Sequence, residues 1–442
     1  MQLTLEARSR RVLTPVAAAA IAVVVALVTF VRIPETARNT MWADDASRFV
    51  GENIRVGLLE SLAIPYGGYL QFVPRIGGWL ALRAGDFPGL ARDVTIVSCG
   101  IAGLFGALVF VLSAQFVRHT WVRVLIGLVP AFVPTIPMET AGNLANLHWY
   151  VLVATPFLFA FVPRHWVSGG LLGVAALLMT LSETQTLLFV PLLLIGINRV
   201  RKAPVVVGAV LGLATQLISL NLAPRTGRND VDLGLSDIAG GYLVQPFAST
   251  WTTDAARVGS IVFRHGWWVL AVPFAVVLLV VAVGFWRGVA PQRIILGSLV
   301  VGSAASWAAP LIITPSTGFL FAHYTLEQFG EFHVVRYTAI ASMFIMMALL
   351  VVVDIAAGIR WSRLPRWTGP VLGGVVTATL VVSAVVNFTV PWSTRDVGPL
   401  FSDGVVTATE QCVGKPADTT ILIPAAPNPN WKLAASCAYV QR

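Results

Sequence analysis

The sequence contains few charged residues. Only 12% of its 442 residues are Asp, Glu, Lys or Arg, whereas about a quarter of the residues of a soluble globular domain are charged. Hydrophobic residues make up 56% of the chain. A soluble fold would have to bury entirely apolar helices along its whole length, so this composition excludes a soluble protein and predicts one that lies in a membrane.

Lysine and cysteine are also scarce, and nucleotide-binding motifs are absent. Arginine carries almost all of the positive charge, and the chain has no P-loop, no dinucleotide-binding fingerprint and no zinc-ligand spacing. The sequence therefore gives no site for a cytosolic nucleotide and no metal site. The net charge of +9 does not predict nucleic-acid binding, because the basic residues are scattered over short segments and do not form one soluble basic face.

Apolar runs of about 20 residues, the length needed to cross about 30 Å of hydrocarbon, recur along the chain. The sequence therefore predicts an all-α polytopic membrane protein with about eleven transmembrane helices. The predicted spans are residues 13–31, 93–115, 121–138, 147–163, 166–182, 184–198, 203–222, 267–286, 292–313, 336–357 and 368–390.

The two sets of connections between these spans differ in charge. One set shares the side of the N-terminal arginines and carries Arg118, Arg123, Arg164, Arg199, Arg201, Lys202, Arg287, Arg293, Arg360, Arg363 and Arg366. The other set carries most of the acids, including Asp44, Asp45, Glu52, Glu60, Glu139, Glu183, Asp230, Asp232, Asp237, Asp254, Glu327 and Glu331. Because basic residues concentrate on the cytoplasmic side, we expect a cytoplasmic N-terminus and an extracytoplasmic C-terminus.

Residues 1–390 are predicted to form the membrane domain, and residues 391–442 a small extracytoplasmic tail. The first outer loop, 32–92, contains an amphipathic stretch, 46–62, that predicts an interfacial helix with Asp45 as its N-cap. Segment 66–83 is apolar enough to span. A span there would invert every later loop, so we expect it to lie on the outer surface or to re-enter partway. Whether Cys412 and Cys437 of the tail form a disulfide stays open.

The first outer loop begins with Met41-Trp42-Ala43-Asp44-Asp45. This acidic pair, directly after a first span with a cytoplasmic N-terminus and before an interfacial helix, resembles the GT-C superfamily of membrane glycosyltransferases. Bacterial arabinofuranosyltransferases and protein O-mannosyltransferases belong to that superfamily. The resemblance implies a GT-C-like fold, a polyprenyl-phosphate sugar as donor, inversion at the anomeric carbon, and Asp44 or Asp45 as the catalytic base. The chain lacks the large soluble C-terminal domain of many members.

Other polar residues of the outer side are candidates for substrate binding. A departing lipid phosphate needs cations or other donors, and Arg75, His148 and Arg336 are the candidates; Arg225, Arg228 and Arg264 are alternatives. The candidates for contacts with sugar or acceptor are Trp42, Tyr69, Gln71, Asn143, Asn146, Glu183, Gln185, His323 and Tyr324. Each also has a structural interpretation, such as helix capping, a tight turn or an interfacial aromatic residue.

The sequence therefore predicts a glycosyltransferase of the bacterial plasma membrane, active on its outer face. It would move a sugar from a polyprenyl-phosphate donor to a cell-envelope glycan or lipid, without a cofactor or a metal. Two alternatives stay open. An O-antigen-type polymerase or ligase would use the loop 223–266, and a flippase or transporter would place polar groups at mid-bilayer, often in repeated halves. The sequence shows no such internal repeat.

Overall fold

The computed structural model describes the whole chain except residues 1, 225–230, 331–334, 359–364, 366, 429 and 442, with the backbone alone for 2–13. The protein is mostly helical (72%). Eight helices in the described part of the chain are long and apolar enough to cross a membrane. They are Thr14–Arg32 of α1 (Gln2–Arg32), α5 (Leu90–Leu112) continued to Gln115, α6 (Thr120–Phe132) continued to Met138, α9 (Ala203–Leu222) with the turn from Val200, α12 (Trp268–Arg287), α13 (Ala290–Ile313), α14 (Val335–Gly358) and α15 (Thr368–Val386).

Three shorter apolar helices coincide with the other three predicted spans. They are α7 (Leu147–Ala160), α8 (Trp166–Thr180) and the 3₁₀ segment η4 (Thr184–Leu194). The structure thus confirms a polytopic helical protein, and the total of eleven spans and their orientation stay predictions. The break before η4 is local, because the side chain of Glu183 accepts a hydrogen bond from the Gln185 amide and so starts a new helix.

Helices α7 and α14 form the centre of the bundle. Every residue of α7 is buried, and so is the apolar stretch of α14. Both sequences are apolar on all faces, as expected of a helix surrounded by others. Helix α12 is hardly covered by the rest of the protein, and most of its apolar surface is left to lipid. Helices α8 and α9 approach closely at Gly208, where an added Cβ would lie 2.1 Å from the Gly173 carbonyl oxygen.

One end of the bundle carries the first loop. It contains α2 (Glu35–Arg38), the π-helical segment η1 (Asp45–Val50), α3 (Gly51–Leu62) and α4 (Phe72–Ala81). The predicted uniform helix over 46–62 is corrected, because Gly57 has a φ of 79° and interrupts α3. Phe49 is buried, as the apolar stripe predicts, whereas Leu59 is exposed. Helix α4 has ten residues, about 15 Å at 1.5 Å per residue. It is not among the helices long enough to cross the membrane, and the placement of 66–83 on the outer surface or partway into the membrane stays a prediction.

Between α9 and α14 the chain forms short elements outside the long helices. They are α10 (Leu235–Tyr242), η6 (Leu243–Phe247), α11 (Ala255–His265), η7 (Thr317–Phe319), η8 (Phe321–His323) and η9 (Gln328–Gly330). Single 3₁₀ turns also occur: η2 (Ser113–Gln115), η3 (Ile136–Met138) and η5 (Val200–Lys202). Several of these elements pack in an apolar cluster of their own around Trp307 and Phe321.

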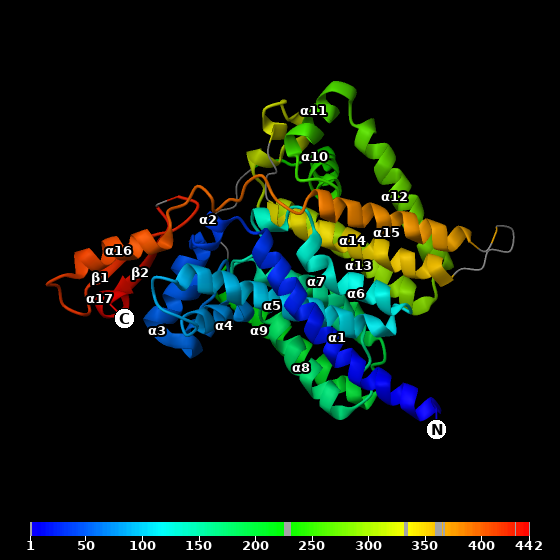
Figure 1. Ribbon diagram of the computed structural model, residues 1–442, viewed down its shortest axis with the longest axis horizontal. Helices are drawn as coiled ribbons and strands as arrows, with labels where there is room; N and C mark the ends of the chain where they lie inside the picture. The colour runs from blue at the N-terminus through cyan, green and yellow to red at the C-terminus, as the bar shows by residue number, and fades with distance from the viewer. Residues whose placement is uncertain are drawn as a thin grey trace.

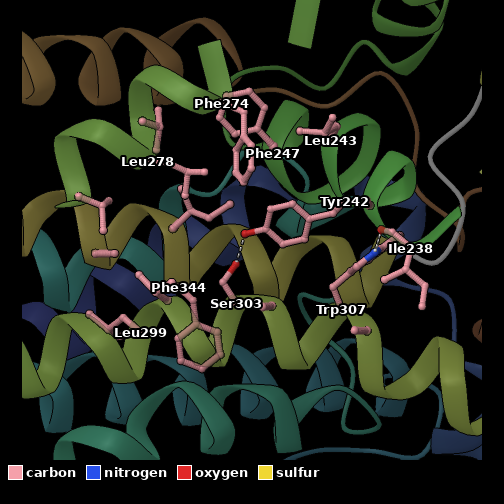
Figure 2. Close-up of a pocket in the computed structure, with 18 of the residues that line it drawn as sticks. Ile238, Tyr242, Leu243, Phe247, Phe274, Leu278, Leu299, Ser303, Trp307 and Phe344 are labelled. Carbon is pink, nitrogen blue, oxygen red and sulfur yellow. Dashed lines mark hydrogen bonds between the residues drawn. The ribbon is translucent and has the colours of Figure 1, made fainter. Parts of the chain in front are cut away.

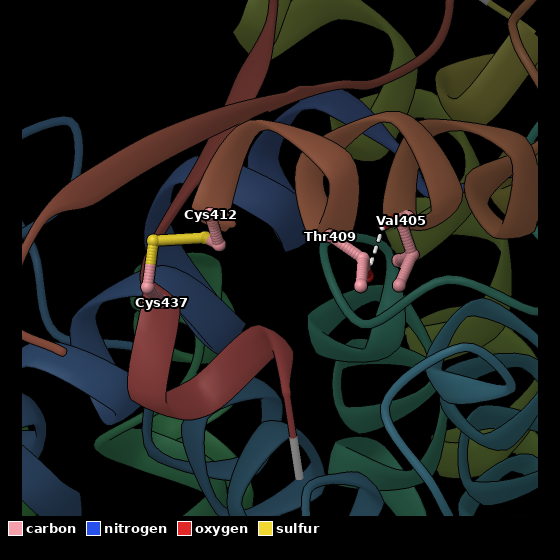
Figure 3. The surroundings of a disulfide bond; sticks show 4 residues. All are labelled: Val405, Thr409, Cys412 and Cys437. Carbon is pink, nitrogen blue, oxygen red and sulfur yellow. Dashed lines mark hydrogen bonds between the residues drawn. A yellow bond between two sulfur atoms is a disulfide. The ribbon is translucent and has the colours of Figure 1, made fainter. Parts of the chain in front are cut away.

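The C-terminal segment folds as a small ordered unit against the first loop. It consists of α16 (Phe401–Cys412), the antiparallel strands β1 (Thr420–Pro424) and β2 (Lys432–Ser436), and α17 (Cys437–Val440). Cys412 and Cys437 form a disulfide (Figure 3). Figure 1 shows this segment, in red, at one end of the molecule beside α2 and α3. The domain boundary near residue 390 stays a prediction.

Candidate functional site

The acidic pair lies under the C-terminal segment. The Ala426 amide donates to the Met41 carbonyl oxygen at 2.8 Å, and Trp42 pairs with Ala426 in a parallel β-bridge. Trp42 is consequently buried. Its predicted sugar contact stays a prediction, and the structure gives it a local packing role. These contacts fix the backbone on which the two carboxylates stand.

Asp45 is fully buried and anchors a distant loop. Its two carboxylate oxygens accept hydrogen bonds from the amides of Leu144 and Ala145, at 3.0 and 2.9 Å. Burial raises the pKa of Asp45 to about 7, while the two amides and nearby Arg395 oppose that rise. The predicted N-cap role is wrong, because its carboxylate bonds to amides about 100 residues away and not to those of its own helix. Asp45 thus has a structural task.

Asp44 is only half-buried and faces Tyr66. The Tyr66 hydroxyl donates to Oδ1 of Asp44 at 2.6 Å. The guanidinium carbon of Arg48, one helical turn after Asp44, lies 5.7 Å from the centre of the Tyr66 ring. Burial and the charge of Asp44 raise the pKa of Tyr66, and the guanidiniums of Arg48 and Arg336 oppose that rise. A carboxylate, a phenol and the Arg48 cation therefore lie together, and the charge of Arg336 also acts on the Tyr66 hydroxyl.

Arg336, at the start of α14, is held by Glu139. Its Nη1 lies 2.8 Å from Oε1 of Glu139, and its backbone amide donates to Oε2 at 3.2 Å. The Glu139 side chain is 7% exposed, whereas that of Arg336 is 40% exposed. Glu139 therefore fixes the guanidinium while part of it stays accessible to a ligand, which suits the predicted phosphate contact. That contact remains a prediction.

The amides of Asn143 and Asn146 are used inside their own loop. Both donate to the Glu139 carbonyl oxygen, at 2.5 and 3.2 Å, and Oδ1 of Asn143 accepts from the Asn146 backbone amide at 2.9 Å. These bonds close the turn that presents the Leu144 and Ala145 amides to Asp45. The structure thus gives both residues a local role, and their predicted contact with a sugar stays untested.

A second polar group forms around His148. Its Nδ1 is hydrogen-bonded to Oε2 of Glu183, whose Oε1 accepts from the Gln185 amide at 2.7 Å. The His148 ring lies 6.5 Å from that of Tyr69, centre to centre. The structure therefore brings four predicted residues into one cluster, in which His148 and Glu183 are buried, Tyr69 is half-buried, and the half-buried Gln185 takes part through its backbone amide.

The turn 66–69 joins the two groups. Gly67 and Gly68 have φ values of 61° and 91°, which glycine adopts without steric strain. The Tyr66 amide donates to the Tyr69 carbonyl oxygen at 2.9 Å. From α9, Gln216 accepts from the Leu70 amide and donates to its carbonyl oxygen. The glycine pair thus sets one tyrosine beside Asp44 and the other beside His148.

Arg75 does not lie where a lipid phosphate could reach it. It is fully buried, with its Nη1 2.5 Å from Oε2 of Glu52 and its Nη2 2.7 Å from the Ile64 carbonyl oxygen. Burial lowers its pKa, and Glu52 opposes that effect. The expectation that an arginine inside an apolar segment binds substrate is therefore corrected, since Glu52 is its partner. Gln71 is also buried, and its Oε1 has no hydrogen-bond partner in the described chain.

The predicted pair His323 and Tyr324 lies elsewhere. Tyr324 packs on Phe321 and Phe329 in the separate apolar cluster, and its hydroxyl donates to the Gly318 carbonyl oxygen, while His323 is exposed. The described contacts do not connect either residue to Asp44, and no group of three or more His, Cys, Asp or Glu side chains that could hold a metal occurs in the described residues. Arg225, Arg228, Glu331 and His333 lie outside the described residues.

Sequence reasoning missed the roles of Tyr66, Arg48, Glu139 and Arg395. Arg395 is buried and donates to the carbonyl oxygens of Ala141 and Gly142 at 3.1 and 3.0 Å, so it holds the loop that contacts Asp45. The spacing of Asp44 and Arg48, which puts them on the same face of a helix, was a usable signal for Arg48. Nothing local in the sequence marks the long-range partners of Glu139 or Arg395.

A large apolar cavity of about 570 Å³ opens between α10, η6, α12, α13 and α14. Its lining is almost entirely apolar, and the Tyr242 hydroxyl and Ser303 Oγ bond to each other at 2.7 Å (Figure 2). Tyr242 and Tyr337 pack against both main apolar clusters of the protein. Tyr337, which follows Arg336 directly, thus packs against the same two clusters as Tyr242 of the cavity.

Comparison of the chain with protein-family models, with curated proteins and with solved structures gives no match. The function is therefore argued from the side chains of the site themselves.

Proposed function

We propose that this protein is an integral-membrane glycosyltransferase that moves a sugar from a polyprenyl-phosphate donor to a cell-envelope glycan or lipid. The observation that carries the proposal is the half-buried Asp44 carboxylate, 2.6 Å from the hydroxyl of Tyr66, whose ring also lies beside the partly exposed Arg48 guanidinium. Asp44, and not Asp45, is assigned as general base, because Asp45 is fully buried and both of its oxygens are occupied by backbone amides.

The transfer needs one proton acceptor and one anion site. An acceptor hydroxyl oxygen attacks the anomeric carbon, its proton passes to Asp44, and the bond from that carbon to the phosphate oxygen breaks. Arg48 and Arg336 hold the charge that develops on the departing phosphate. A single displacement of this kind inverts the anomeric carbon. Asp44 then returns the proton to water.

The apolar cavity supports a lipid-linked donor. A polyprenyl chain is apolar throughout and forms no hydrogen bonds. A cavity of about 570 Å³ with an almost entirely apolar lining therefore suits such a chain. Helix α12, which flanks the cavity, is largely uncovered by protein, so a chain can enter sideways from the bilayer. A polyprenyl-phosphate donor and the charge asymmetry of the loops both favour activity on the outer face of a bacterial plasma membrane.

The test is an assay of the purified full-length protein in sealed proteoliposomes. Synthetic polyprenyl-phosphate-linked pentoses and hexoses serve as donors, extracted envelope lipids and glycans as acceptors, and release of polyprenyl phosphate is measured. We expect release with wild type and a loss of about 10²-fold or more with Asp44→Asn, the scale of a missing general base. Full activity in Asp44→Asn, or movement of intact donor across the membrane without covalent change, would contradict the proposal.

A further inference from the structure

A second cavity, of about 760 Å³, lies at the other end of the bundle from Asp44. Helix α8 connects the two ends, because Glu183 of the site follows its C-terminus and Trp166, at its N-terminus, lines the cavity. The 15 residues of α8 span about 22 Å at 1.5 Å per residue. The cavity is therefore separate from the proposed catalytic site and does not depend on its function.

This cavity is strongly basic. Arg164, Arg199 and Arg201 line it together with the polar side chains of Gln115 and Asn198, and its lining contains no Asp or Glu. All three arginines are exposed, and in the described part of the chain none of them forms an ion pair. Three uncompensated guanidiniums around one hollow give a site for an anion with several oxygen atoms, such as a phosphodiester.

The walls of the cavity are held in place by buried side chains. Gln115 donates to the Val162 carbonyl oxygen at 2.8 Å and accepts from the Val162 amide at 2.9 Å. Lys202 is buried and donates to the carbonyl oxygens of Phe159 and Phe161 at 2.6 and 2.5 Å. These bonds fix the connection from α7 to α8 against η2 and η5. The backbone that carries the three arginines is therefore held in place without a ligand.

The surroundings of the cavity favour a lipid over a soluble anion. Trp166 is 56% exposed at its rim, and Val200, between two of the arginines, is 70% exposed. Exposed apolar side chains also continue along α8, at Val167 and Leu171. Tryptophan beside arginine is typical of the level of lipid head groups, and basic pockets between helices on the cytoplasmic side bind anionic head groups.

We propose that this arginine cavity, formed by Gln115, Arg164, Trp166, Asn198, Arg199 and Arg201, binds the head group of an anionic phospholipid. The guanidiniums contact the phosphodiester oxygens, and the acyl chains lie along the exposed apolar face of α8. The bound lipid connects the α7–α8 turn to the start of α9, so it stabilises the folded protein.

The test measures thermal unfolding of the purified full-length protein in neutral detergent during titration with phosphatidylglycerol. We expect a saturable rise in melting temperature with phosphatidylglycerol, and none with phosphatidylcholine. In Arg199→Gln/Arg201→Gln, the half-saturating concentration should rise about thirtyfold, equivalent to about 1 kcal/mol for each arginine. The matched control is Arg287→Gln/Arg293→Gln, which removes the same charge from another arginine-rich turn on the same predicted side and should leave the titration unchanged.

Three results would overturn the proposal. They are an equal response to phosphatidylcholine, the same weakening in both double variants, and an equal rise with inorganic phosphate alone, which would identify a free-anion site. Because the arginines are exposed and form no ion pair with any described residue, the double variant is expected to fold. If it does not melt cooperatively, Arg164→Gln supplies the same comparison, and an unchanged titration in that variant counts against the site.

Discussion

The Tyr66 hydroxyl lies 2.6 Å from Oδ1 of Asp44, although 22 residues separate the two along the chain. Two glycines and the α9 side chain Gln216 shape the turn that carries Tyr66 to this position. The phenol donates its hydrogen and so orients the carboxylate, and no hydrogen bond from the described residues occupies the other oxygen, Oδ2, which can accept a proton. Tyr66 is accordingly a positioning residue for the proposed base.

Tyr66→Phe should therefore reduce kcat more than it changes KM. Removing one hydrogen bond to a charged group costs about 1.5–3 kcal/mol, which corresponds to roughly a 10- to 100-fold fall in kcat. Steady-state kinetics with the polyprenyl-phosphate donor measure both constants. The control is Tyr66→Phe in the Asp44→Asn background, where a residue that acts through Asp44 should have no further effect. A rise in KM with unchanged kcat would show that Tyr66 binds substrate and does not orient Asp44.

The membrane part of this fold was readable from the sequence because span length is set by bilayer thickness. Every predicted span has an apolar helix in the structure, and the break at Glu183 follows from its capping bond to the Gln185 amide. The site was readable only in part. The acidic pair was visible in the sequence. Which of the two carboxylates is structural and which is accessible was not, because Asp45 bonds to amides about 100 residues away.

Arg75 illustrates the same limit. An arginine in an apolar segment is expected to have a partner, and its sequence context does not distinguish a substrate phosphate from a protein carboxylate. The partner, Glu52, lies in the preceding helix, where a periodic pattern assigns it to a solvated face. Whether Glu52 becomes buried beside Arg75 depends on how α3 and α4 pack together, and no local sequence pattern encodes that packing.

Arg48→Gln should weaken donor use without loss of stability. The Arg48 side chain is 50% exposed, and its contact with Glu52 is long, at 3.4 Å, so its loss should change the free energy of unfolding by less than about 1 kcal/mol. Loss of a cation at a phosphate should lower kcat/KM by about 10- to 100-fold. Arg55→Gln, which changes an exposed arginine of the adjoining helix α3, is the control. Equal kinetics in the two variants would remove Arg48 from the site.

Asp45→Asn should destabilise the protein and flatten part of its pH dependence. An asparagine retains one acceptor and leaves one buried amide unpaired, at a cost of about 1–3 kcal/mol. In the wild type, burial raises the Asp45 pKa from 3.8 to about 7, so between these values the folded state binds more protons than the unfolded state. The free energy of unfolding contributed by this group is therefore highest at acid pH and falls as pH rises toward about 7.

Melting temperatures of wild type and Asp45→Asn at pH 5 and pH 8 measure this effect. The difference between the two proteins isolates Asp45 from the other titrating groups. We expect the wild type to lose more stability than the variant between these pH values. Parallel curves, or a greater loss in the variant, would mean that Asp45 is ionised over the whole range.

The disulfide between Cys412 and Cys437 should stabilise both the C-terminal unit and the site beneath it. The two cysteines are 25 residues apart, and closing a loop of that length is worth about 3–4 kcal/mol in the chain-entropy model. The Ala426 amide within this loop donates to the Met41 carbonyl oxygen, so loosening the loop also frees the backbone of the acidic pair. Cys412→Ser/Cys437→Ser should therefore lower both the melting temperature and the transfer rate.

Reducing agent should lower the melting temperature of wild type and of Cys99→Ala, but have no further effect on the double variant. If wild type melts identically with and without reductant, the unit does not depend on the bond, and the contacts of Ala426 and Trp42 alone must hold Asp44 in place.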